Sequence, residues 1–137
     1  MTPNRSLTIV MAASEAVPFS KTGGLADVAG ALAVALARRG HAVHLFVPLY
    51  RMTDRRRFGI PARGKGVTVP MSTRKVEGKL LSVVHEGVNV HFVQQDRYYD
   101  REALYHTPAG DYPDNLERFV FFCKAILAGI LKLGLTP

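Results

Sequence analysis

An apolar run that leads through a glycine turn into a helical pattern constrains this chain more than any other feature. Residues 7–13 (LTIVMAA) are continuously apolar, which is typical of a strand buried on both faces. The turn 20–24 (SKTGG) follows, and a helical repeat of apolar residues then ends at 38–40 (RRG), a good helix stop. Residues 41–47 predict a second strand, which Pro48 ends. The order strand, helix, strand predicts a β-α-β unit, and therefore a fold of the α/β class with a Rossmann-like parallel sheet.

The rest of the sequence predicts more strands and a second helix. The further strands are expected over 66–71 and 80–85, as a possible antiparallel hairpin, and over 87–93. A loop is expected through Tyr112-Pro113. The second helix is expected to begin at Asp114, where Glu117 three residues later resembles a capping box, and to end at Gly134.

Each predicted helix carries an apolar face. The first face consists of Leu25, Val28, Ala29, Leu32 and Leu36. The second is wider and consists of Leu116, Phe119, Val120, Phe122, Cys123, Ile126, Leu127, Ile130 and Leu131, which predicts a core position for the cysteine. Such a wide face normally lies between a sheet and further neighbours. We therefore expect exposed apolar area and an unpaired strand edge, and with them self-association.

The composition is that of one ordinary globular domain. With 137 residues, 47% hydrophobic and 21% charged, the chain is long enough for a single core. One cysteine excludes an internal disulfide framework, and the five histidines lack metal-ligand spacing, so we expect structural roles for them and no metal site. Neither a membrane-spanning apolar run nor a secretory signal pattern is present, which predicts a cytoplasmic location without a membrane partner.

The net charge of +7 favours anionic partners without naming one. Six of the cations lie close together at Arg51, Arg55, Arg56, Arg57, Arg63 and Lys65. A solvated basic loop explains them. A nucleic-acid interface is the alternative, but no aromatic residue separates the arginines before Phe58, and no RNA- or DNA-binding motif accompanies them. We therefore expect no nucleic-acid partner.

The turn between the first strand and the first helix is the strongest candidate site. In open α/β sheets ligands bind beyond the carboxyl ends of the strands, and a helix N-terminus offers free N–H groups and a partial positive charge. Gly23 and Gly24 allow backbone amides to approach a phosphate, and Lys21 adds an ammonium group. Together they predict a diphosphate site, with a plain strand-to-helix connection as the alternative.

Neither of two common phosphate motifs is present at this turn. The dinucleotide pattern G-x-G-x-x-G is absent because Gly23 and Gly24 are adjacent and the next glycine is Gly30. The Walker pattern fails because Lys21-Thr22 precedes the glycines instead of following them.

Other polar residues near the turn have two interpretations each. Asp27 lies in the first helical turn, where it either belongs to the site or only stabilises the helix dipole. Glu15 follows the first strand and faces either a sugar hydroxyl or water. Tyr98 and Tyr99 either cover a base or sugar, or are partly buried in the ordinary way.

Residues 13–28 (ASEAVPFSKTGGLADV) resemble, nearly position for position, the N-terminal signature of the bacterial glycogen synthase and plant starch synthase family. The resemblance covers almost the whole chain, because it continues through 39–41, 48–51, 99–101, 104–105, 111–115 and 118–119. Two departures are His106 and Cys123, where glycine and serine are common; neither touches the candidate phosphate site.

This resemblance implies a retaining glycosyltransferase that transfers glucose from ADP-glucose to the non-reducing end of an α-1,4-glucan such as glycogen, without a cofactor. It implies that residues 1–137 form an incomplete Rossmann-like N-terminal domain of the two-domain GT-B arrangement, with the C-terminal domain absent. The principal catalytic groups of the family would follow residue 137. We therefore expect no catalytic residue in this chain and no activity from it alone, with a non-catalytic ADP-sugar-binding remnant as the alternative.

The same resemblance implies roles for the candidate residues. Lys21 resembles the lysine that contacts the donor phosphates, with Gly23 and Gly24 supplying backbone amides. The remaining substrate-binding candidates are two acidic residues at the active-site cleft and a tyrosine near the nucleotide sugar, namely Glu15, Asp27 and Tyr99.

Overall fold

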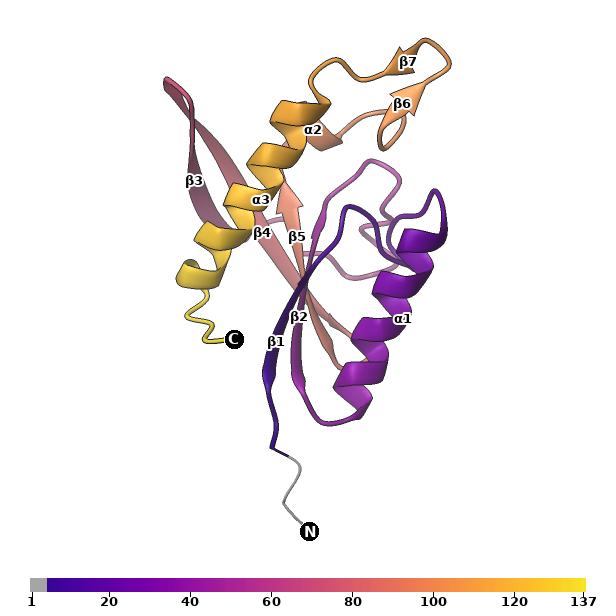
Figure 1. Cartoon of the computed structure of the whole chain (residues 1–137), viewed down its shortest axis with the longest axis vertical. Helices are drawn as coiled ribbons and strands as arrows, with labels where there is room; N and C mark the ends of the chain where they lie inside the picture. Colours follow the sequence, from indigo (N-terminus) through magenta and orange to yellow (C-terminus); the bar gives the residue numbers. More distant parts are fainter. Residues whose placement is uncertain (1–4) are drawn as a thin grey trace.

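The computed structural model describes residues 5–137 and contains a five-stranded sheet in the order β1-β2-β5-β4-β3 (Figure 1). The strands are β1 Thr8–Ala12, β2 Ala42–Pro48, β3 Lys65–Met71, β4 Arg74–His85 and β5 Val88–Gln94. β1, β2 and β5 are parallel, whereas β4 and β3 are antiparallel neighbours beyond β5. The α/β class, the parallel unit and the antiparallel hairpin are confirmed. β4 begins six residues earlier than expected because it pairs with both β3 and β5.

Two helices cover opposite faces of the sheet, α1 (Gly24–Arg38) on one and α3 (Asn115–Lys132) on the other (Figure 1). The alternation along β2 shows this division. Phe46 packs in the core beneath α3, while Leu45 and Val47 pack in the core beneath α1. The connection from β5 to α3 contains a short helix and a small hairpin, α2 (Asp96–Tyr99), β6 (His106–Thr107) and β7 (Gly110–Asp111).

Both helices end at a glycine, as the sequence predicts. Gly134 has a φ of 66°, and the Leu135 N–H donates to the Ile130 carbonyl at 3.0 Å. Gly40, with a φ of 89°, ends α1 in the same way. This left-handed conformation lets the chain satisfy the last carbonyls of the helix, and it favours glycine.

The expected buried face of α1 is confirmed at two positions, because Ala29 is buried and Leu36 packs against the core, and is wrong at the other three. The helix turns its small residues to the core, with Ala26, Ala29, Gly30 and Ala33 buried, and leaves Leu25, Val28 and Leu32 exposed. The reason is close approach, since a Cβ at Gly30 would lie 2.3 Å from the Val17 carbonyl oxygen. Small size, not hydrophobicity, therefore decides which side of this helix is buried.

Two expectations about α3 are also wrong. Cys123 is exposed, because Phe121, Phe122, Ala125 and Ile126 occupy the buried side of the helix.

The capping box is absent as well. Asp114 is the N-cap residue, but its side chain accepts no N–H from the helix. Arg101 binds both of its carboxylate oxygens, at 2.7 and 2.6 Å, and Glu117 pairs with Arg74 instead of reaching back. The two carboxylates therefore tie α3 to the β5–α3 connection and to the β3–β4 hairpin.

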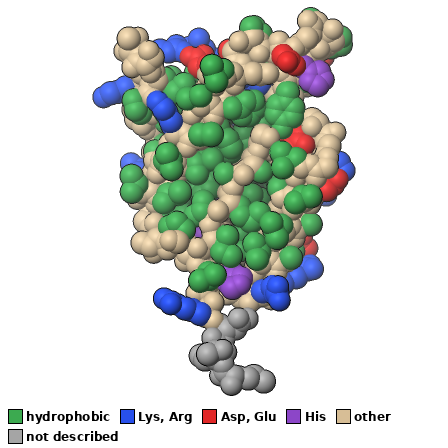
Figure 2. All heavy atoms as spheres, viewed as in Figure 1, with side chains coloured by type: hydrophobic (Ala, Val, Ile, Leu, Met, Phe, Trp, Pro, Cys, Tyr) green, Lys and Arg blue, Asp and Glu red, His purple; other side chains and the backbone are tan. Residues whose placement is uncertain are grey.

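Apolar side chains remain at the surface on both sides of the edge strand β1. Hydrophobic atoms spread across the face between α3 and α1 (Figure 2). On α3 the most exposed are Leu116, Leu127 and Leu131, at 81%, 65% and 83%. The expected exposure of part of the wide apolar face is confirmed. No helix within residues 5–137 combines the length and apolar character that crossing a bilayer requires.

We predict that this surface makes the chain self-associate. Replacing Leu127 and Leu131 with Gln removes two exposed apolar side chains from the same side of α3, and sedimentation velocity should then shift from oligomers toward monomer. The control is Lys132→Gln, an exposed position on the same helix that should leave the distribution unchanged. A compact monomer for the unmodified chain at micromolar concentrations contradicts the prediction.

Two histidines stack between the parallel strands β2 and β5. The rings of His44 and His91 are nearly parallel, with an angle of 5° between their planes. His44 Nδ1 lies 2.9 Å from His91 Nε2. The other nitrogen of His91, Nδ1, lies 2.6 Å from Ser82 Oγ on β4. Burial, together with His44, lowers the pKa of His91 to about 4. Burial lowers the pKa of His44 as well, and His91 stays neutral at pH 7. This pair is among the histidines for which structural roles were expected.

This pair predicts a pH dependence of stability. In the unfolded chain His91 takes up a proton near pH 6.5, whereas in the folded chain it does so only near pH 4. The free energy of unfolding should therefore fall as the pH decreases from about 6.5 to about 4, by up to about 3 kcal/mol. Urea denaturation of the unmodified chain and of His91→Gln checks this, because the gap between them should narrow over that range. Equal slopes for both chains contradict it.

Candidate anion-binding site

The turn after β1 is built around the carboxylate of Glu15, which is 2% exposed. Glu15 Oε2 accepts the Thr22 N–H at 3.1 Å and the Thr22 hydroxyl at 2.6 Å, while Oε1 accepts the Gly23 N–H at 3.3 Å. The Tyr105 hydroxyl donates to Oε2 as well, at 3.2 Å. A buried carboxylate is stable only when donors surround it, so these bonds fix the path of the turn.

This placement of Glu15 differs from both interpretations of the sequence. The side chain faces neither water nor an open site, because it is bonded inward to the turn that follows it. The Gly23 amide, expected to face a phosphate, is bonded to Glu15. The amides left at the start of α1 are those of Gly24 and Leu25, since the first N–H groups of a helix have no carbonyl four residues earlier in the helix.

Lys21 and Asp27 meet at the N-terminal end of α1. Lys21 Nζ lies 2.9 Å from each carboxylate oxygen of Asp27, and both side chains are about half exposed, at 52% and 54%. An ion pair this exposed is worth about 1 kcal/mol or less, so it exchanges readily. The ammonium is therefore held at the start of the helix without being locked there.

The two glycines of the turn leave open space. Gly23 has an extended φ of −159°, which any residue adopts, and Gly24 has no left-handed φ either. A Cβ built on either residue meets no atom within 4 Å. Nothing in the packing of the described chain requires glycine here, and the amides at the start of α1 stay uncovered.

Tyr99 is not part of this surface. Its ring is 0% exposed, makes an edge contact with the ring of Tyr50, and donates its hydroxyl to the Arg118 carbonyl at 2.8 Å. Burial raises the pKa of Tyr99, so its hydroxyl stays protonated. Tyr98 is also fully buried. Of the candidate residues, the structure brings together Glu15, Lys21, Gly23, Gly24 and Asp27, and places Tyr99 in the core beneath α3.

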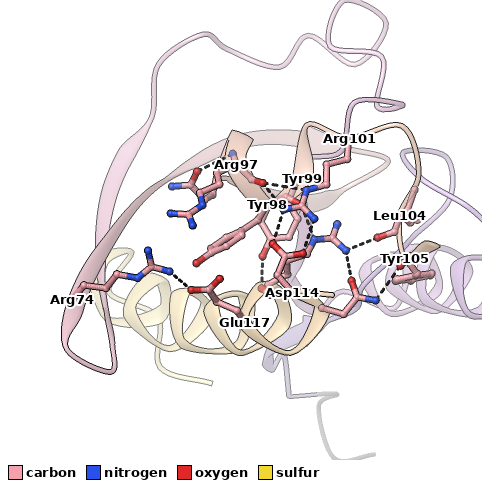
Figure 3. Close-up of polar contacts among 12 residues, drawn as sticks. Arg74, Arg97, Tyr98, Tyr99, Arg101, Leu104, Tyr105, Asp114 and Glu117 are labelled. Carbon is pink, nitrogen blue, oxygen red and sulfur yellow. Dashed lines mark hydrogen bonds and ion pairs between the residues drawn. The ribbon is translucent and has the colours of Figure 1, made fainter. Parts of the chain in front are cut away.

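A polar cluster surrounds the two tyrosines at the start of α3 (Figure 3). Its centre is Arg118, which is fully buried and which the sequence analysis did not single out. The sequence does contain a signal for it. Arg118 lies among the apolar positions of the predicted second helix, between Leu116 and Phe119, and an arginine buried there needs hydrogen-bond partners. Tyr105 and Ser14 were missed for a different reason. Their contact with each other, 2.7 Å between Oη and Oγ, joins residues 91 positions apart.

The basic segment after β2 is an exposed loop, as the simpler interpretation expected. Arg51 pairs with Asp100 at 2.9 Å, and Arg57 lies over the ring of Phe58 at 4.9 Å. The side chains of Arg55 and Arg56 are exposed. Residues 5–137 contain no cluster of three or more His, Cys, Asp or Glu side chains placed to hold a metal ion.

The fold and the position of the turn are together typical of α/β domains that bind nucleotides. A Rossmann-like α/β domain carries a lysine, paired with an aspartate, at the turn after the carboxyl end of its first strand, and such folds bind nucleotides at this edge of the sheet.

Comparison with known proteins gives the family. A family model of the starch synthase catalytic domain matches residues 8–137. The glycogen synthase of Syntrophotalea carbinolica is 44% identical over 131 residues, which cover 96% of this chain and 27% of that enzyme. The glycogen synthase of Koribacter versatilis is 47% identical, over 92% of this chain and 26% of that enzyme. The chain belongs to the starch synthase catalytic domain family, and the expected kinship is confirmed.

A solved structure supports the same conclusion. The catalytic domain of starch synthase IV from Arabidopsis thaliana, bound to ADP and acarbose, superimposes with a TM-score of 0.80 and 29% identity. The match covers 96% of this chain and 26% of that one, and that neighbour has the GT-B fold. The chain thus spans about a quarter of the length of the relatives that it matches.

We predict that Glu15 stabilises the domain. Glu15→Gln places an amide NH₂ where the carboxylate accepts hydrogen bonds from N–H groups, so two donors must face each other. The free energy of unfolding should fall by about 1–3 kcal/mol. The control is Glu102→Gln, which makes the same substitution at an exposed position. It should change the free energy of unfolding by less than about 0.5 kcal/mol. Equal small effects for both variants in chemical denaturation contradict the prediction.

Proposed function

We propose that the turn after β1 binds the diphosphate of ADP-glucose, as the donor-site part of a synthase that extends an α-1,4-glucan with retention in the cytoplasm. One observation carries the proposal. The Lys21 ammonium lies at the N-terminal end of α1, within 2.9 Å of Asp27, beside two glycines whose missing side chains leave the helix amides open. The kinship with glycogen synthases and with a starch synthase bound to ADP supports this choice of ligand.

The charges at the turn fit a diphosphate. The first-turn amides and the partial charge of the helix attract an anion, and Lys21 can leave the exposed Asp27 carboxylate for a phosphate oxygen. Glu15 does not oppose this anion directly, because its carboxylate is bonded inward to Thr22, Gly23 and Tyr105. Glu15 holds the turn, and Lys21 and the amides of α1 contact the donor.

Tyr99 has an indirect role in this proposal. Its buried ring supports Tyr50, whose hydroxyl donates to the Ser14 carbonyl at 2.6 Å. Tyr99 therefore supports, through Tyr50, the backbone at Ser14 that leads into the turn, and it does not contact the nucleotide.

Calorimetric titration with ADP tests the donor site. Lys21→Ala should weaken binding by about 10- to 100-fold, because it removes a charge-assisted contact worth about 1.5–3 kcal/mol. The matched control is Arg38→Ala, which removes an exposed cation from the opposite end of the same helix and should leave affinity unchanged. Equal losses of ADP affinity in the two variants would indicate nonspecific attraction between a basic protein and an anion, and would contradict the site.

We also propose that residues 1–137 alone transfer no glucose. Catalysis requires groups placed where charge develops in the transition state, and the catalytic groups that the family resemblance implies lie outside these residues. Incubation of the purified chain with radiolabelled ADP-glucose and glycogen should give no incorporation above that of heat-denatured chain. Incorporation that depends on Lys21 would overturn this proposal while supporting the donor site.

A further inference from the structure

A tyrosine hydroxyl from the β5–α3 connection reaches into the turn after β1. Tyr105 Oη lies 2.7 Å from Ser14 Oγ and 3.2 Å from Glu15 Oε2. Burial raises the pKa of Tyr105, so the hydroxyl keeps its proton at neutral pH and can donate to the carboxylate. Through this contact a segment 90 residues away in sequence touches the carboxylate that holds the Thr22 and Gly23 amides.

The backbone around Tyr105 is held by Arg118 and its neighbour Asn115. Arg118 Nη1 donates to the Leu104 carbonyl at 2.8 Å and to Asn115 Oδ1 at 2.8 Å. Asn115 Nδ2 in turn donates to the carbonyl of Tyr105 itself, at 3.0 Å. Two successive carbonyls are thus bonded to side chains from the first turn of α3. Leu104 and Tyr105 lie together at one end of this polar cluster (Figure 3).

Arg118 is committed to this task. Its Nε donates to the Tyr98 carbonyl at 2.7 Å, so that the hydrogen-bond partners of its guanidinium are neutral oxygens. The guanidinium carbon lies 5.0 Å from the ring centre of Tyr112 and 5.2 Å from that of Phe119. A buried cation is costly, and here carbonyl oxygens at Nε and Nη1 and aromatic faces offset part of that cost, while Nη2 has no hydrogen-bond partner among the described residues. The side chain joins α2, the following loop and α3 into one rigid unit.

We propose that Tyr105 is a positioning residue for the diphosphate-binding turn, because its hydroxyl, on backbone that Arg118 and Asn115 hold in place, fixes the carboxylate of Glu15. The inference rests on the proposed function and extends it to a residue that makes no contact with the donor. Without the hydroxyl, Glu15 loses one of its four hydrogen bonds and gains rotational freedom. The Thr22 and Gly23 amides then lose a fixed acceptor, directly beside Lys21.

The test compares Tyr105→Phe with Tyr112→Phe. Both variants remove one hydroxyl from the same connection, but the Tyr112 hydroxyl accepts the Ala103 N–H at 3.2 Å and does not take part in the bonds of Glu15. In calorimetry, Tyr105→Phe should weaken ADP binding by about 3- to 10-fold, with Tyr112→Phe close to the unmodified chain. In ¹⁵N-resolved NMR without ligand, Tyr105→Phe should shift the amide signals of Thr22 and Gly23, and Tyr112→Phe should not.

The two readouts separate this inference from the proposed function. If the unmodified chain binds ADP and Tyr105→Phe binds it equally well, the inference is overturned and the donor site stands. If the unmodified chain does not bind ADP, the donor site fails, and the amide signals still decide whether Tyr105 positions the turn. Unchanged Thr22 and Gly23 signals in Tyr105→Phe overturn the positioning role in either case. Arg118→Lys provides a second variant, and its Thr22 and Gly23 signals should shift in the same direction.

Discussion

The buried carboxylate of Glu15 is the interaction on which the geometry of this domain's site depends. A charge with 2% exposure persists only if hydrogen bonds replace its hydration, and Glu15 receives four of them. Three come from the turn that carries Lys21, and one comes from Tyr105 on the β5–α3 connection, 90 residues away in the sequence. The same bonds that stabilise the carboxylate therefore position the turn relative to α1 and the β5–α3 connection.

The site combines a fixed carboxylate with an exchangeable ion pair. Glu15 is buried and has its hydrogen bonds satisfied from within the chain, whereas Lys21 and Asp27 are half exposed and held by a weak pair. This division suits the binding of an anion. The rigid part keeps the helix amides in place, and the loose part lets the ammonium change partners when a phosphate arrives. The proposed donor site needs both properties.

The sequence predicted the features that depend on short stretches of chain. The β-α-β unit and the glycine stops at Gly40 and Gly134 follow from local hydrophobic pattern and backbone freedom, and the structure has them. The location of Lys21 and Asp27 at the start of α1 follows from the same local order.

Features set by distant contacts were not predictable in this way. The buried face of α1 depends on the close approach of Val17 to Gly30. The prediction that Leu25, Val28 and Leu32 face the core was therefore wrong. The capping box failed because Arg101 competes for Asp114. The inward bonds of Glu15 require Tyr105, and the sequence gives no sign that these two residues meet.

An ADP titration followed by ¹⁵N-resolved NMR tests the central claim most directly, because it reports where the ligand binds as well as whether it does. The account predicts that the largest amide shifts occur at Gly24 and Leu25, with smaller shifts at Lys21 and Asp27. Shifts that concentrate in the basic loop around Arg55 and Arg56, with the start of α1 unchanged, would contradict it.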